Sequence, residues 1–105
     1  MLGHAVLAAP DASAVPGLTP DENSYVSCLA ERDIGPAFAV GGTYYDLAEG
    51  GRRIAYDIRR GVDPVDEAYA IYKATNLSLN QSVWEVACAV AVFAPEMIPP
   101  SNYAA

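Results

Sequence analysis

Residues 78–95 read SLNQSVWEVACAVAVFAP, and the expected architecture follows from this segment. It opens on Ser78 with Gln81 three positions later, the capping-box pattern that begins a helix. It closes on Pro95, which cannot continue a helix. The residues between are apolar on most sides of a helical wheel, and a helix that is apolar nearly all round is buried. We therefore expect a central helix at about 79–94.

The same kind of start signal recurs three times before this stretch. An N-capping side chain is followed by a proline at the first helical position, or by an acid three residues later. These N-caps are Thr19, Thr43 and Asp63. Stop signals follow at Gly35, Gly61 and Asn76. The sequence predicts three further helices, at about 20–33, 44–60 and 64–75.

Apolar residues in these segments recur at three- and four-residue steps, as in helices that bury one face. The clearest stripe is Leu47, Gly51, Ile54, Ala55 and Ile58. Gly51 within it permits close approach by a neighbouring helix. No alternating pattern of useful length indicates a strand. We expect an all-α, compact bundle of four helices with the last one central, and a loop at 35–42 that folds back over the core.

The chain divides into a leader, a body and a tail. Residues 1–18 begin apolar and contain Ala12-Ser13-Ala14, the small-x-small form that signal peptidase cleaves. The positively charged start of an export signal is missing, so the alternative is a disordered leader that carries no targeting signal. We favour the remnant of an export signal at 1–18, followed by a single helical domain at 19–98 and a flexible tail at 99–105.

Composition excludes several classes of protein. Six basic residues against thirteen acidic ones give the 105-residue chain a net charge of −7, which disfavours nucleic acid as a partner. The longest apolar run in the body, residues 86–94, is too short to cross a bilayer. One histidine, His4, and two cysteines exclude the usual zinc clusters. We expect no metal, no cofactor and no transmembrane segment.

The two cysteines, Cys28 and Cys88, fall on the first and last expected helices. An even count in an exported protein favours pairing, and a bridge closing so long a loop would stabilise the domain by roughly 4 kcal/mol. The alternative is a pair of small buried hydrophobic side chains. Export and pairing stand together, because the cytosol is reducing.

Catalytic residues are not evident. Ser-His and Cys-His pairs are excluded from the body, because the single histidine lies in the leader. The acids in first turns are explained by the helix dipole. Glu85 is the one acid in the apolar helix, and burial would raise its pKa. Its neighbours Gln81 and Ser82 favour an exposed polar edge instead, so we expect no enzyme.

Arginine and tyrosine supply the candidate binding residues. Arg52, Arg53, Arg59 and Arg60 would form an anion-binding patch, or a solvated face with Glu49–Arg53 and Arg53–Asp57 pairs, which we favour. The seven tyrosines would line a binding surface, or simply pack at the core and rim, which we also favour. A binding surface is best sought where the second helix meets the third, near Tyr56, Arg59, Arg60 and Tyr69.

The order of motifs resembles a known family. Tyr25-Val26-x-x-Leu29, Gly51-x-x-Ile54 and Phe93-Ala94-Pro95, within residues 21–96, are similar to motifs of small secreted actinobacterial proteins. This family, common in mycobacteria, is catalogued as a domain of unknown function. It carries Gly-x-x-Val-Cys and Tyr-Cys-Pro motifs, and both cysteine positions are alanine here, at Ala55 and Ala94. The resemblance implies that these alanines lie near each other, and it brings no activity.

Taken together, these patterns predict a non-enzymatic, exported binding or accessory protein of the cell envelope or exterior. Its partner would be a protein or an envelope component. The alternative is an acidic intracellular interaction or inhibitor protein with free thiols, located in the cytoplasm.

Overall fold

A computed structural model describes residues 14–98; the expected leader up to residue 13 and the tail at 99–105 lie outside the described part. Within it, four α-helices and two short 3₁₀ turns follow one another, and no strand occurs. The α-helices are α2 (Pro20–Ala30), α3 (Tyr44–Arg59), α4 (Pro64–Ala74) and α5 (Leu79–Phe93). The 3₁₀ turns are η1 (Pro36–Phe38) and η2 (Pro95–Met97). The all-α prediction is confirmed.

All four predicted N-caps are in place. Three helices begin with full capping boxes, in which the N-cap hydroxyl accepts from the N3 backbone and the N3 side chain accepts from the N-cap backbone. These N-caps are Thr19, Thr43 and Ser78. At α4 the Asp63 carboxylate accepts from the backbone N–H of Val65. The helix starts are therefore fixed by local sequence.

The helix ends are less well predicted, and α2 differs most. It ends at Ala30, three residues before the expected position 33. The chain turns at Asp33, which adopts a left-handed conformation with φ 60°, rather than at Gly35. The N–H of Ile34 then donates to the carbonyl of Leu29 at 3.1 Å. Asp tolerates this conformation better than most residues do, which is why the turn precedes the glycine.

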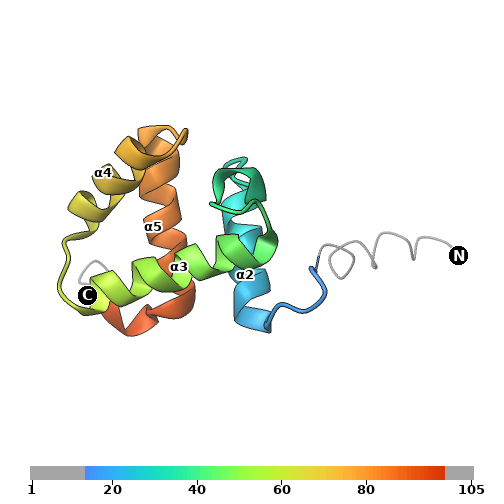
Figure 1. The fold of residues 1–105 in the computed structure, drawn as a ribbon. Coiled ribbons are helices and arrows are strands. Elements are labelled where there is room, and N and C mark those ends of the chain that lie inside the picture. The colour runs from blue at the N-terminus through green and yellow to red at the C-terminus, as the bar shows by residue number, and fades with distance from the viewer. Residues whose placement is uncertain (1–13, 99–105) are drawn as a thin grey trace, which may run out of the picture.

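Helix α5 is the central element, as expected, because it contacts α2, α3 and α4. Figure 1 shows α2 and α4 on opposite sides of α5, and α3 runs across α5 and α2. The predicted close approach at Gly51 of α3 is also confirmed. A Cβ built there would lie 2.5 Å from the ring of Tyr25 and 2.9 Å from the ring of Phe93.

The segment at 35–42 covers part of the core, as predicted. Its turn η1 contacts α3, and Phe38 and Ala39 pack against the buried cluster. Helix α5 was expected to be buried nearly all round, but it is not, since Val83 remains 53% exposed. The central helix is therefore left open to solvent along one edge, beside α4.

Candidate functional site

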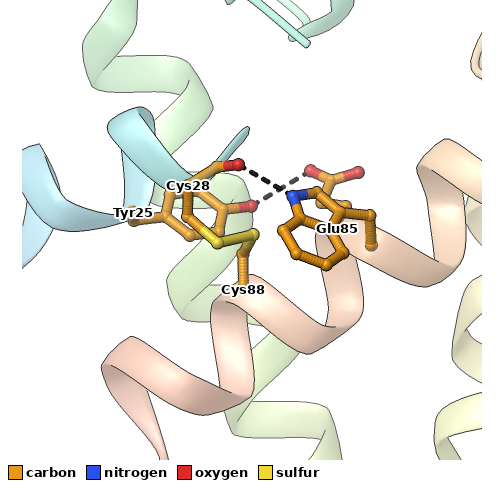
Figure 2. Close-up of a disulfide and its surroundings, with 5 residues drawn as sticks. Tyr25, Cys28, Glu85 and Cys88 are labelled. Atoms are coloured by element: carbon orange, nitrogen blue, oxygen red, sulfur yellow. Dashed lines mark hydrogen bonds between the residues drawn. A yellow bond between two sulfur atoms is a disulfide. The ribbon is translucent and has the colours of Figure 1, made fainter. Parts of the chain in front are cut away.

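Helices α2 and α5 are joined by a disulfide between Cys28 and Cys88, whose Cα atoms lie 5.9 Å apart (Figure 2). This separation is usual for a disulfide. Beside it, the indole N–H of Trp84 donates to the carbonyl of Cys28 at 2.7 Å. Of the two alternatives for the cysteines, the paired one is confirmed.

Glu85 lies inside this interface, and the prediction that it forms an exposed edge is wrong. Its side chain is only 9% exposed, and its Oε2 accepts a hydrogen bond from the Tyr25 hydroxyl at 3.1 Å (Figure 2). The neighbouring Ser82 is fully buried and donates to the carbonyl of Ser78. The polar edge of α5 thus faces other protein groups, because α2 supplies Tyr25 as a partner.

Burial raises the pKa of Glu85, and the hydrogen bond from Tyr25 opposes that rise. Burial also raises the pKa of Tyr25, and the nearby charge of Glu85 adds to the effect. Tyr25 therefore stays a neutral hydrogen-bond donor at ordinary pH. One carboxylate oxygen of Glu85 thus accepts the hydrogen bond from Tyr25, and the other accepts none from the residues that the structure describes.

Glu85 also lines a cavity of about 540 Å³, here called the acidic cleft. Helices α3, α4 and α5 and the segment around η1 form its walls. The lining residues are Phe38, Ala39, Val40, Asp46, Leu47, Glu49, Gly50, Arg53, Ile54, Asp57, Glu67, Ile71, Thr75 and Glu85. Five of these are acids and one is a base.

Within the acidic cleft, the neighbouring acids perturb the carboxyl of Glu67. Burial raises the pKa of Glu67 to about 7, and a hydrogen bond with Asp57 and the charges of Asp57 and Glu85 add to the rise. Like charges that approach this closely disfavour joint ionisation. Near neutral pH, the Glu67 carboxyl is therefore protonated for part of the time.

The arginines pair differently from the prediction. The expected Glu49–Arg53 and Arg53–Asp57 pairs do not form; the ion pairs among residues 14–98 are Arg52–Glu22 and Arg59–Glu96. Arg53 still lines the acidic cleft. The observed ion pairs join residues of different helices, whereas the expected pairs were between neighbours on one helix.

A second concave region, here called the apolar groove, lies mainly between α4 and α5. Its volume is about 360 Å³. The lining residues are Ile58, Pro64, Val65, Ala68, Tyr69, Leu79, Val83, Val86, Ala87, Val90, Met97 and Ile98. No carboxyl, amine, guanidinium or imidazole group is among them. Several of the side chains are largely exposed, with Val65 at 65% and Val83 at 53%.

The four residues expected to form a binding surface are divided among different environments. Tyr56 is exposed, and the guanidinium of Arg60 lies 5.3 Å from its ring centroid. Arg59 forms an ion pair with Glu96, and its Nη2 donates a hydrogen bond to the carbonyl of Phe93 at 2.7 Å. Tyr69 lines the apolar groove. Neither concave region gathers these residues into one site.

Neither concave region is predicted as a site by the sequence patterns. The acidic cleft assembles Asp57, Glu67 and Glu85 from three helices, and no local spacing relates them. The apolar groove has a weak signal in the sequence, because α5 carries more apolar residues than the fold buries. Leu79 and Val83 are examples that stay exposed. That excess indicated a central helix, and it also indicates a face without a partner.

Comparison with family models, with curated proteins and with solved structures found no match. The resemblance to the actinobacterial family therefore stays a prediction. Ala55 and Ala94 are both buried in the same core cluster. None of the described helices is both long enough and apolar enough to cross a membrane.

Proposed function

We propose that this chain is an exported, non-enzymatic binding protein of the cell envelope or exterior. In this proposal the apolar groove takes the apolar face of a helix from a different protein. The observation that carries the proposal is the continuous exposed apolar lining of the groove, led by Val65 and Val83. Single exposed apolar residues are ordinary, but a contiguous patch is typical of an interaction site.

The shape of the groove supports a helical partner. Two neighbouring helices, α4 and α5, form its walls, and an amphipathic helix laid along such a groove anchors through residues three and four apart. The lack of charged lining groups favours binding over chemistry, because catalysis by acid, base or nucleophile needs such groups.

Charge favours a different protein over a second copy. Each copy carries a net charge of −7, so two copies repel each other when they approach. A partner with basic residues flanking its apolar face would be attracted instead. The expected occupant is therefore an amphipathic helix with a net positive charge.

Export is supported by the disulfide between Cys28 and Cys88. Such bonds persist in oxidising compartments and are rare in the cytosol. The alternative function, an intracellular interaction protein with free thiols, requires both sulfurs to be reduced. Thiol titration of the denatured natural protein distinguishes the two, since two free thiols would contradict the exported function.

The partner is tested by photo-crosslinking in the producing cells. A benzoylphenylalanine placed at Val83 should give one discrete adduct with a different protein, whereas the same group at Ala70, on the exposed side of α4, should not. The captured protein, once purified, should bind at least about tenfold more weakly to Val83→Asp than to Ala70→Asp. A crosslinked dimer of this chain, or equal labelling from both positions, would overturn the proposal.

A further inference from the structure

We infer that the acidic cleft is a binding site for a small organic cation, with a primary ammonium or guanidinium head on an apolar body. This site is separate from the apolar groove. Neither inference depends on the other, because the two regions share no lining residue.

The first argument is the buried carboxylate at the wall of the cleft. Glu85 is nine-tenths buried, and within residues 14–98 its one side-chain hydrogen bond is the one that Oε2 accepts from Tyr25 (Figure 2). No fully buried side-chain oxygen or nitrogen among the described residues lacks a partner. The second oxygen of Glu85 is therefore reached from the cleft, where a ligand could donate to it.

The second argument is charge. Asp57, Glu67 and Glu85 come from three different helices and line the same cavity. Arg53 is the one basic lining residue, and it forms no ion pair with them among the described pairs. Removing carboxylates from water without a cation costs several kcal/mol or forces protonation. A bound cation would offset that cost for the carboxyls that line the cleft.

The third argument concerns the body of the ligand. The other walls of the cleft include the apolar side chains of Phe38, Leu47, Ile54 and Ile71. A volume of about 540 Å³ falls within the range usual for small-molecule sites. Within residues 14–98, no group of three acidic, histidine or cysteine side chains is placed to hold a metal ion. The arrangement thus favours an organic cation with an apolar part over a bare metal ion.

The test uses phenethylammonium as the probe and 2-phenylethanol as its uncharged match, with binding measured by calorimetry and by NMR shifts at pH 8. Phenethylammonium should bind at least about tenfold more tightly than the alcohol. The shifted resonances should include Ile71 and Ile54. Equal affinity for the two probes, no binding of either, or shifts confined to other parts of the protein would overturn the inference.

Variants locate the site. Glu67→Gln and Glu85→Gln should each weaken phenethylammonium binding at least about tenfold, whereas Glu31→Gln, at an exposed position following α2, should leave it unchanged. If Glu85→Gln fails to fold, the half-buried Glu67 variant decides the matter. Full-strength binding to Glu67→Gln would contradict the inference.

Two further measurements sharpen the chemistry. The affinity should rise between pH 6 and pH 8, because a cation binds the ionised cleft, and binding should release protons to the buffer. An affinity that falls over this interval would count against the site. Nα-acetyl-lysine methylamide, tested in parallel, distinguishes the source of the cation. Tighter binding of this analogue identifies a protein lysine side chain, and tighter binding of phenethylammonium identifies a free amine.

Discussion

The two sides of helix α5 are held in different ways. Toward α2, it carries the disulfide of Cys88, the hydrogen bond of Trp84 and the Tyr25–Glu85 pair. Toward α4, no side-chain hydrogen bond, ion pair or disulfide joins the two helices among the described residues, and the apolar groove and the acidic cleft both have walls from α4 and α5. One side is fixed by covalent and directional bonds and the other by burial alone. Both concave regions of the described chain lie partly against α4.

The difference also shows why a polar residue in an apolar helix needs care. Gln81, Ser82 and Glu85 were expected to mark the solvent side of α5. Glu85 instead accepts from Tyr25 of α2, and the Gln81 amide donates to the carbonyl of Arg32, in the turn that follows α2, at 2.9 Å. A buried polar group is tolerated when a partner satisfies it. The exposed edge is the apolar one, beside α4.

The largest expected effect comes from breaking the α2 side. The double variant Cys28→Ala/Cys88→Ala should lose roughly 4 kcal/mol in free energy of unfolding, because the bridge closes a long loop and restricts the unfolded chain. Urea denaturation measures the loss. Hydrogen exchange should then show α2 opening as readily as α4. A loss below about 1 kcal/mol would mean that the two sides differ less than the bond suggests.

A smaller effect tests the packing of α3 against the α2 side. Gly51→Ala should destabilise the domain by about 1–3 kcal/mol, because the new Cβ would overlap the rings of Tyr25 and Phe93. The matched variant is Gly50→Ala, where the added Cβ meets no atom within 4 Å. That variant should be neutral or more stable by roughly 0.5–1 kcal/mol, since alanine favours a helix. Equal effects at the two positions would contradict the close approach.

The smallest effect tests the α4 side and depends on pH. The pKa of Glu67 is raised to about 7 in the folded chain, so the folded state binds a proton more tightly than the unfolded state. Stability is therefore greatest below the unfolded pKa and is lost as pH rises toward and through 7.

Because Glu67 is partly exposed, the loss due to this residue should be on the order of 1 kcal/mol between pH 5 and pH 8. Glu67→Gln should flatten the profile, and Asp66→Asn, on the exposed side of the same turn, should not. Denaturation at several pH values measures both. A profile unchanged by Glu67→Gln would show that the cleft carboxyls do not interact across the helices.

The fold class and the helix starts of this protein are encoded locally in its amino-acid sequence. Capping groups such as Thr19 and Ser78 act within one turn, and apolar stripes reflect the helical period, so both are local properties. The capping pattern placed every helix start correctly. The end of α2 was missed, because Asp33 took the turn that Gly35 was expected to take.

Which side chains from different helices lie together follows from the packing of the domain. It paired Cys28 with Cys88, buried Glu85 against Tyr25, and brought Asp57 and Glu67 together with it in one cleft. These residues are distant in the chain, so their proximity depends on how the helices pack. Spacing along one helix orders its own faces, but which neighbour each face meets follows from the packing of the whole domain.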